Sequence, residues 1–243
     1  MSDNVSRETF LKSGLTGLGV DFKQIDIDRT IRYFDLIAEY SQAINLVGNS
    51  EFRNLAVRHL YDSLALYKFI TNHDIKKVVD VGSGAGFPGM ALAIFIGSVK
   101  FTLIESNAKK SNLLETVISS IEIRNAAVMN DRAENVGRMS EYREKFDAAV
   151  ARALAKTPIS FELLSPLAKE NGYVVLYKSR RGMKEIVNYS NAAKMLSLEL
   201  DMVMDIKVPN LQEERVLLIY KKITAIPQRY PRRPGIPQKR PVL

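Results

Sequence analysis

The chain lacks cysteine altogether and has only two histidines, His59 and His73, among its 243 residues. The absence of cysteine excludes disulfides, thiolate metal ligands and a cysteine nucleophile. Structural zinc sites draw their ligands from cysteine and histidine, and two histidines are too few to supply them. We therefore expect no bound metal.

Long hydrophobic runs are also missing. The longest apolar stretch, 90–96, is far shorter than the roughly 20 residues that a membrane-spanning helix needs. The first residues, 1–4, are polar and acidic, unlike a signal peptide. We expect a cytoplasmic protein without a membrane partner, of a length that suits one main domain with a modest extension, and we expect a monomer.

The net charge of +8 is concentrated at one end of the chain. Residues 221–243 contain seven lysines and arginines and no acidic residue, whereas the other 28 basic residues nearly balance the 27 acidic ones. The same segment holds five of the nine prolines, which predicts neither a helix nor a central strand. One interpretation is an extended tail that binds RNA phosphates, with Tyr230 stacking on a base. A disordered solubilising tail is the alternative.

Two hydrophobic patterns divide the rest of the chain. Over 5–72, apolar residues such as Ile27, Ile31 and Phe34 recur at helical spacing. From Lys77 onward, short apolar runs alternate with helical stretches, which predicts a parallel sheet covered on both faces. The expected strands are 78–81, 101–104, 126–129, 148–151, 173–177, 198–208 and 216–220.

The last two expected strands are joined by only seven residues, 209–215, too few for a helical crossover. They should therefore form an antiparallel hairpin. Together these patterns predict an α/β protein with a Rossmann-like, mostly parallel doubly wound sheet and an antiparallel last strand. We divide it into an N-terminal helical extension over 1–72, a main domain over 73–221 and a basic proline-rich tail over 222–243.

A glycine-rich loop follows the first expected strand. Segment 80–89 has the sequence Asp-Val-Gly-Ser-Gly-Ala-Gly-Phe-Pro-Gly, which places Gly82, Gly84, Gly86 and Phe87 directly after that strand. Glycine lets the backbone approach a ligand closely and adopt a positive φ. Open α/β sheets bind ligands at the carboxyl ends of their strands. The loop is therefore a candidate cofactor site.

Two cofactors suit this loop. Residues 84–89 match the dinucleotide pattern Gly-x-Gly-x-x-Gly, which alone is a weak signal. Starting from Asp80, the loop is instead acid-x-Gly-x-Gly-x-Gly, the first motif of S-adenosylmethionine enzymes. An acid would repel a pyrophosphate at a helix N-terminus but suits an ammonium and a sulfonium. Glu105 ends the second strand and suits the ribose of either cofactor, so Asp80 and the lack of a separate substrate domain favour S-adenosylmethionine.

The residue types also restrict the methyl acceptor. Methylation of pyrimidine C5 usually requires a cysteine nucleophile, which is absent. Exocyclic amine methylases typically carry an Asn/Asp-Pro-Pro-aromatic box after the fourth strand, whereas 146–153 here is Phe-Asp-Ala-Ala-Val-Ala-Arg-Ala. An acceptor that is already nucleophilic remains, such as purine N7. An enzyme for that atom needs no general base and works by positioning.

Several motifs occur together in a distinctive order. They are Asn45-Leu46, Arg58-His59-Leu60-Tyr61-Asp62-Ser63, the glycine loop with its Gly-Phe-Pro-Gly extension, Asp131-Arg132-Ala133-Glu134, Val150-Ala151-Arg152-Ala153 and Glu214-Arg215. In this order the chain closely resembles the bacterial small-subunit ribosomal RNA guanine-N7 methyltransferases, the glucose-inhibited division protein B family. The resemblance covers nearly the whole chain. It implies a Rossmann-like methyltransferase that uses S-adenosylmethionine to methylate one guanine N7 in 16S ribosomal RNA of the small subunit.

The resemblance also implies roles for single residues. Gly82 and Phe87 would contact the cofactor from the loop, and Arg152 would reach the junction of cofactor and substrate. Ala133 and Glu134 would lie against the adenine. Glu105 stands where some family members have aspartate, a mild departure that should preserve the ribose contact.

Other residues are assigned to the RNA side. His59, Asp62 and Ser63 should not form a hydrolase triad, because side chains within one helical turn point outward side by side. The resemblance favours a role in the substrate cleft for His59 and Asp62, with structural hydrogen bonding as the alternative. Lys178 and Arg215 are expected to bind RNA phosphates, unless they are simply solvated.

Asn45 is assigned to the guanine pocket, with a helix C-terminal cap as the alternative.

Three rival functions stay open. A small-molecule methyltransferase of the same fold would have an acidic or apolar rim around its site. An NAD-dependent oxidoreductase would need an acid–base residue, for which only His59 or His73 is available. An RNA-binding protein that has lost catalysis would not need Asp80 and Glu105.

Overall fold

The computed structural model describes residues 2–41, 47–48, 50–183, 186 and 188–243. The helices that precede the sheet are α1 (Ser2–Leu18), α2 (Gln24–Ser41), α3 (Phe52–Asn54), the π-helix η1 (Leu55–Tyr61), α4 (Asp62–Leu64) and α5 (Tyr67–Asn72). The later helices are α6 (Gly89–Phe95), α7 (Ala108–Ser120), α8 (Ala133–Val136), α9 (Thr157–Leu164), the 3₁₀ helix η2 (Arg180–Met183), α11 (Ser190–Met195) and α12 (Ile236–Lys239).

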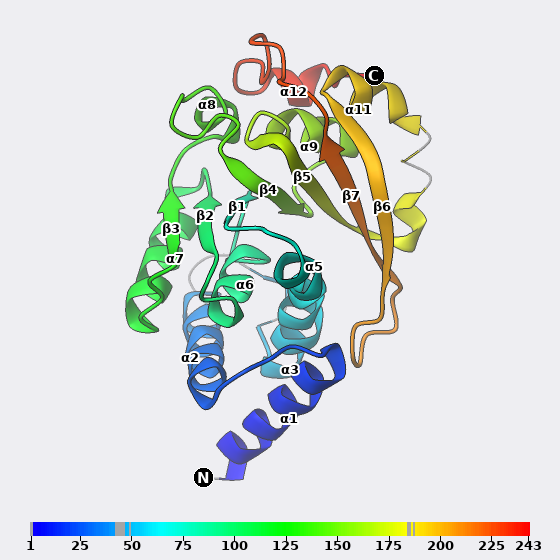
Figure 1. Ribbon diagram of the computed structural model, residues 1–243. Coiled ribbons are helices and arrows are strands. Elements are labelled where there is room, and N and C mark those ends of the chain that lie inside the picture. The colour runs from blue at the N-terminus through cyan, green and yellow to red at the C-terminus, as the bar shows by residue number, and fades with distance from the viewer. Residues whose placement is uncertain (1, 42–46, 49, 184–185, 187) are drawn as a thin grey trace.

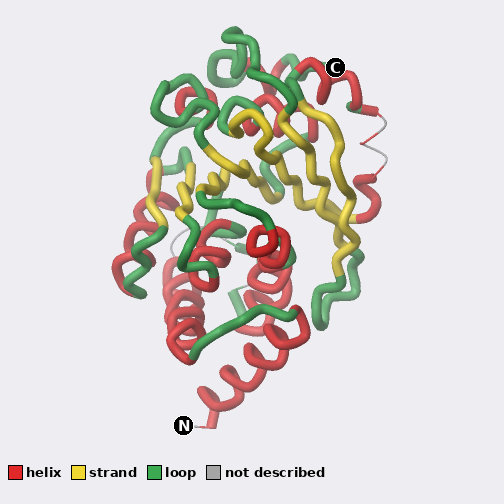
Figure 2. The backbone as a smooth tube through the Cα atoms, in the orientation of Figure 1, coloured by secondary structure: helices red, strands yellow, loops and turns green. Residues whose placement is uncertain are grey.

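A seven-stranded sheet forms the centre of the molecule, between two layers of helices (Figure 2). Its strands are β1 (Lys77–Val81), β2 (Lys100–Ile104), β3 (Ala126–Met129), β4 (Phe146–Arg152), β5 (Ala168–Ser179), β6 (Leu198–Ile206) and β7 (Arg215–Lys222). Their order is β3-β2-β1-β4-β5-β7-β6. The pairs from β3 to β5 are parallel, whereas β7 runs antiparallel to both of its neighbours. The predicted fold class is confirmed, including the terminal hairpin.

The N-terminal helices cover one face of the sheet, together with α6 and α7 (Figure 1). Apolar side chains from α1, α2 and η1, such as Leu15, Phe34 and Leu60, are buried there in one hydrophobic cluster with residues of α6 and the sheet. Burial of this kind removes apolar surface from water and is the main stabilising term in folding. Of the residues whose helical spacing predicted an apolar face, Ile27 and Phe34 are buried and Ile31 is partly buried against the same cluster.

The C-terminal tail covers the opposite face, with α8, α9 and α11 (Figure 1). Ile226, Tyr230 and Val242 of the tail belong to the hydrophobic cluster of that face. The expectation that the tail contains no helix is wrong, because α12 forms a single turn with Pro237 in its first turn, where proline loses no hydrogen bond. Base stacking by Tyr230 is wrong too, since the side chain is only 5% exposed.

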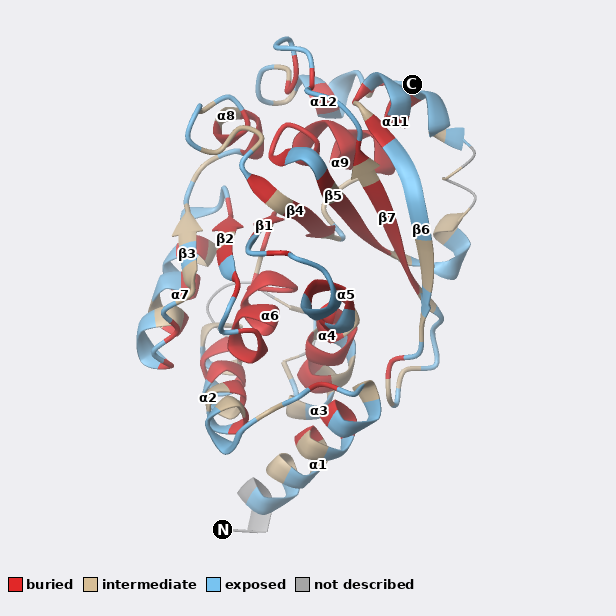
Figure 3. Ribbon diagram, in the orientation of Figure 1, coloured by how far each residue is buried: buried red, intermediate tan, exposed pale blue. Residues whose placement is uncertain are grey.

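Burial is unequal across the sheet (Figure 3). Strands β4 and β7 are buried along most of their length and β5 is buried over 174–177, while β6 at the edge exposes side chains such as Leu200 and Met202. Strands buried on both faces carry continuous apolar runs, as the sequence of β4 does. Among the described helices, none combines the length and the apolar character needed to cross a membrane.

Candidate active site

The sheet order places the candidate site. Strands β1 and β4 are neighbours, but the chain leaves β1 toward β2 and leaves β4 toward β5, on the other side. A crevice opens at the carboxyl ends of strands where the order reverses in this way. The glycine loop follows β1 and Arg152 is the last residue of β4, so both lie at this crevice.

The loop needs its glycines. Gly82, Gly84 and Gly86 all have positive φ, at 72°, 59° and 104°, a region that other residues rarely adopt. A Cβ atom on Gly82 would lie 2.5 Å from Leu154, and one on Gly86 would lie 2.5 Å from the Tyr33 hydroxyl. Any side chain at Gly82 or Gly86 would therefore displace its neighbours.

Helix α2 contacts the glycine loop through Tyr33. The Tyr33 hydroxyl donates to the carbonyl of Ala85 at 2.5 Å, and the Tyr33 and Phe87 rings lie 5.4 Å apart. Tyr33 is fully buried, and burial raises the pKa of its hydroxyl well above the usual value. Tyr33 was not among the residues of the helical pattern, and no sequence signal marks its contact with the loop.

Two carboxylates hold the loop's backbone. Asp80 Oδ2 accepts the N–H of Gly89 at 2.9 Å, and Glu105 Oε2 accepts the N–H of Gly84 at 2.9 Å. Glu105 Oε1 accepts the N–H of Asn107 at 2.7 Å. Burial raises the pKa of Asp80 to about 6, opposed by the Gly89 hydrogen bond, Ser83 and the charge of Arg152.

These contacts bear on the choice of cofactor. Gly89 begins α6, and its N–H is the group that a pyrophosphate would use at a helix N-terminus. Here Asp80 occupies that N–H, and Glu105 occupies the N–H of Gly84. Asp80 Oδ1 is buried without a hydrogen bond from the described residues. Two carboxylates and an unpartnered oxygen suit a cationic cofactor such as S-adenosylmethionine and disfavour a dinucleotide.

Arg152 is held by three groups of the preceding helices. Its NH1 group donates to the carbonyl of Arg58 at 2.8 Å and to Asp62 Oδ2 at 3.1 Å. Its NH2 group lies 2.8 Å from His59 Nδ1, and its guanidinium carbon lies 5.4 Å from the centre of the Phe87 ring. The side chain is therefore fixed beside the loop rather than mobile.

His59 and Asp62 do converge, contrary to the sequence argument that they point outward side by side. Both contact Arg152, and the wider turn of the π-helix η1 precedes Asp62 in the chain. They still form no hydrolase triad, because Ser63 donates to the His59 carbonyl at 2.5 Å. Burial, Arg152 and Arg58 lower the pKa of His59 to about 4, so the ring is neutral and Nδ1 can accept from Arg152.

Asp62 also reaches a second arginine. Its Oδ1 atom lies 3.4 Å from Nε of Arg215, the first residue of β7, and Asp62 is 5% exposed. One buried carboxylate thus joins Arg152 and Arg215. The sequence motifs contained all three residues, but nothing in their spacing showed that they form one group.

One cavity of about 500 Å³ brings most of the predicted residues together. Its lining includes Gly82, Gly84, Phe87, His59, Asp62, Arg152, Lys178 and Arg215. A second cavity of about 180 Å³ is lined by Ala133 and Glu134, the residues assigned to the adenine. Asp80, Gly86 and Glu105 line neither cavity, although Asp80 and Glu105 accept hydrogen bonds from the backbone of the loop. Asn45 lies outside the described residues.

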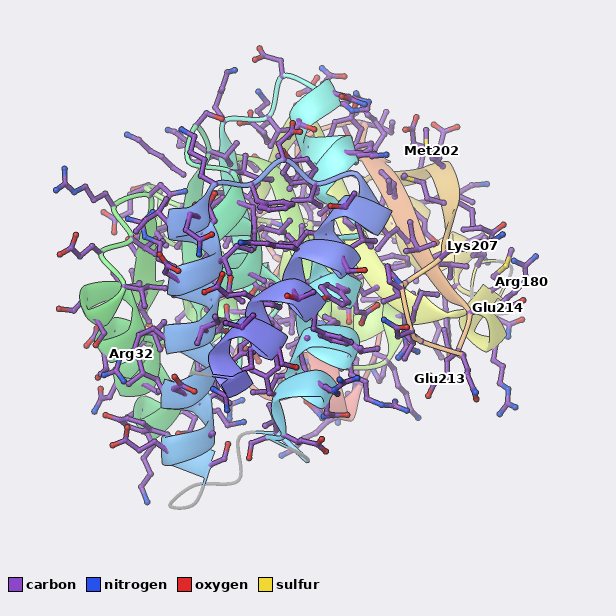
Figure 4. The ribbon with its side chains drawn as sticks, turned by 90° about the horizontal axis from the view of Figure 1, so that it is seen from below. Arg32, Arg180, Met202, Lys207, Glu213 and Glu214 are labelled. Carbon is purple, nitrogen blue, oxygen red and sulfur yellow. The ribbon has the colours of Figure 1, made fainter. Side chains whose placement is uncertain are left out.

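The basic residues at and near the larger cavity differ in their surroundings. Lys178 and Arg215 line the larger cavity. Arg180, which follows β5, instead forms ion pairs with Asp205 and Glu214 at the β6–β7 hairpin (Figure 4). Arg180 is also absent from the lining of the larger cavity, which makes it a weaker candidate for phosphate binding there than Lys178 or Arg215.

The fold defines the class of protein. A SAM-dependent methyltransferase from Aquifex aeolicus superposes with a TM-score of 0.51 at 16% identity, covering 67% of this chain and 93% of that chain. A predicted O-methyltransferase from Agrobacterium tumefaciens gives a TM-score of 0.53 at 16% identity, covering 68% and 81%. The chain has the fold of the SAM-dependent methyltransferases.

Sequence comparison then defines the family. Residues 26–216 match the GidB family, described as rRNA small subunit methyltransferase G. A protein named ribosomal RNA small subunit methyltransferase G from Carboxydothermus hydrogenoformans is 35% identical over 97% of this chain and 100% of its own length. One of the same name from Bacillus subtilis is 30% identical over 95% of this chain and 96% of its own length. The chain belongs to the GidB family.

Proposed function

We propose that this protein transfers a methyl group from S-adenosylmethionine to N7 of one guanine in 16S ribosomal RNA. The observation that carries the proposal is the single cavity in which the glycine loop and Arg152 meet the basic residues Lys178 and Arg215. The loop suits a cation without phosphate, and the rim suits a polyanion. The names of the relatives supply the RNA and the subunit.

The cofactor would occupy the crevice above β1. Its proposed contacts are Asp80, Gly82, Gly84, Gly86, Phe87, Glu105, Ala133, Glu134 and Arg152. Asp80 would act through its charge on the cofactor's cationic groups, and Glu105 has lone pairs left for ribose hydroxyls beyond its two backbone contacts. The unpartnered oxygen of Asp80 supports this assignment.

Catalysis would consist of alignment. When bound, the cofactor supplies a methyl group activated by its sulfonium sulfur. Guanine N7 carries a free lone pair at neutral pH, so no side chain has to remove a proton. Arg152 would hold the base in line with that methyl group, while His59 and Asp62 position Arg152. Lys178 and Arg215 would bind RNA phosphates. We place the reaction in the cytoplasm, where ribosomes act, and assign it to a monomer without a metal.

The rival functions explain the site less well. A small-molecule methyltransferase would not need Arg58, Lys178 and Arg215 around the cavity. In an oxidoreductase, the acid–base residue would have to be His59, which is occupied by Arg152, or His73, whose Nδ1 contacts the Phe69 carbonyl away from the cavity.

The test is transfer of labelled methyl from S-adenosylmethionine to small ribosomal subunits from a strain that lacks this gene. Cleavage at 7-methylguanosine would map the product to one guanine. Binding of the cofactor without any transfer to this RNA would exclude the proposed substrate. Labelling at several unrelated positions would exclude the proposed specificity.

Arg152→Lys supplies the residue-level test. Lysine keeps the charge but not the forked geometry, so we expect turnover to fall about 100-fold, the cost of a small misplacement of reacting groups. Arg32→Lys is the matched control, because Arg32 is exposed on α2, on the side away from the hairpin in Figure 4. Turnover of Arg152→Lys close to that of the control would remove Arg152 from the mechanism.

A further inference from the structure

The tail reaches the cofactor crevice. The second cavity is lined by Pro237 and Gln238 of α12, opposite the main-domain residues Ala133 and Glu134. Both cavities share Gly82, Leu154 and Ala155 on their walls. The two cavities therefore adjoin at Gly82, near the start of the glycine loop, and the tail supplies part of the wall of the smaller one.

The approach of the tail to this cavity is anchored at Glu134. Glu134 Oε1 accepts the N–H of Gly235 at 3.0 Å, and Glu134 is 6% exposed. Gly235 has a φ of 81°, which glycine adopts without strain, and α12 begins at the next residue. The nearby Arg138 donates from Nε to the Pro231 carbonyl at 2.8 Å. The chain just before Gln238 is therefore held at two points.

Charge pairs hold the rest of the tail to the main domain. Arg232 donates from its backbone N–H and its guanidinium to Glu162, whose carboxylate is fully buried in α9. Arg143 donates to the carbonyls of Ile226 and Tyr230. A buried carboxylate needs such partners, because an unpaired charge in the interior is strongly destabilising. The tail is thus part of the folded domain.

The remaining walls of the small cavity suit a flat heterocycle. Its lining combines five large apolar side chains, Val81, Ile104, Leu154, Ile159 and Leu163, with the polar residues Ser106, Asp131 and Arg132. A purine base needs apolar surface on its faces and hydrogen-bonding groups on its edge. Gln238, an exposed residue that belongs to the cavity lining, carries a carboxamide that offers both a donor and an acceptor.

We propose that the C-terminal tail completes the adenine end of the cofactor site, with Gln238 binding the edge of the base and Pro237 packing against it. This inference rests on the proposed cofactor and adds residues outside the glycine loop to its site. It gives Glu134 an indirect role, since that carboxylate holds the tail in place. The basic tail then serves cofactor binding, while the RNA contacts lie around Lys178 and Arg215.

The experiment measures binding of two ligands to full-length variants by calorimetry. S-adenosylmethionine is the first ligand, and 5′-methylthioadenosine, which has the adenosine but no amino acid group, is the second. We expect Gln238→Ala to weaken both by about fivefold, the value of one neutral hydrogen bond. Gln228→Ala is the matched control, since Gln228 is an exposed glutamine of the same tail that lines neither cavity.

Turnover separates this role from a structural one. For Gln238→Ala, the KM for S-adenosylmethionine should rise while kcat at saturating cofactor and the Tm stay unchanged. Wild-type affinity of Gln238→Ala for both ligands would overturn the inference and leave the proposed methyl transfer intact. Failure of the wild-type protein to bind either ligand would instead overturn the proposed function, and the inference with it.

Discussion

The two ends of the chain cover opposite faces of one sheet, and they are attached by different forces. The N-terminal helices bury apolar side chains such as Leu11, Leu15 and Ile37 completely. The tail is short and rich in proline, and much of its attachment consists of hydrogen bonds and ion pairs to Arg143 and Glu162. A short segment that cannot bury a large core can still dock firmly when the body supplies buried polar partners.

Both ends also support the candidate site, at different places. Helix α2 holds the glycine loop through Tyr33, and η1 holds Arg152 through His59. The tail lines the smaller cavity through Pro237 and Gln238. We therefore expect substitutions in the N-terminal helices and substitutions in the tail to change stability and ligand binding in different ways.

The largest effect is expected from Arg232→Ala. The variant leaves the fully buried carboxylate of Glu162 with only a backbone partner, so the free energy of unfolding should fall by about 3 kcal/mol or more. Urea unfolding at pH 7 measures this loss. Arg233→Ala is the control, because Arg233 is exposed and the described structure shows it in no ion pair. Equal stability of the two variants would mean that the pair with Glu162 does not anchor the tail.

The next prediction concerns the pH dependence of stability, which should differ between the N-terminal helices and the tail. His59 has a pKa lowered to about 4 from 6.5, so its neutral form belongs to the folded state and the unfolded state binds the proton first. The stability that it contributes is complete above pH 6.5 and is lost as the pH falls toward 4. The loss is at most about 3 kcal/mol, and less because the ring is incompletely buried.

The stability that the attachment of the tail contributes should be lost only at a lower pH. Burial alone would raise the pKa of Glu144, but hydrogen bonds from the Ile226 N–H and Lys222 outweigh it and lower the pKa below 4.5. Its stabilising effect is present above pH 4.5 and is lost below. The difference in the free energy of unfolding between the wild type and His59→Gln should therefore shrink as the pH falls from 7.5 to 4, while the difference between the wild type and Glu144→Gln stays constant down to about pH 5. A difference for Glu144→Gln that already changed above pH 5 would contradict the separation.

The smallest effect is expected from Gly14→Ala in α1. A Cβ atom there would lie 2.1 Å from the ring of the buried Tyr61, so we expect a loss of about 1–3 kcal/mol from overpacking. Gly17→Ala on the same helix is the control, because its Cβ would lie 3.5 Å from Pro209 in ordinary contact. Alanine favours a helix more than glycine does, so Gly17→Ala should not destabilise. Gly14→Ala as stable as Gly17→Ala would show that the packing of α1 on Tyr61 is loose.

The sequence predicted the parts whose signal is local. The strands follow continuous apolar runs, and the observed β1, β2 and β3 differ from the expected bounds by at most one residue at either end. The glycine loop was predicted because positive φ values require glycine at fixed places in a tight turn. The mistaken interpretation of the tail arose where the relevant partners, Arg143 and Glu162, lie about 70 or more residues away.

By itself, the sequence determined the fold class and the glycine loop, because periodicity and turn chemistry depend on neighbours along the chain. The other residues of the candidate site, such as Arg152 and Glu134, were assigned through the family resemblance. Only the tertiary structure decided that Asp62 joins Arg152 to Arg215, that Asp80 and Glu105 occupy the backbone N–H groups of the loop, and that the tail lines the smaller cavity. These are contacts between distant segments. Their geometry depends on how helices and strands pack, which local patterns do not contain.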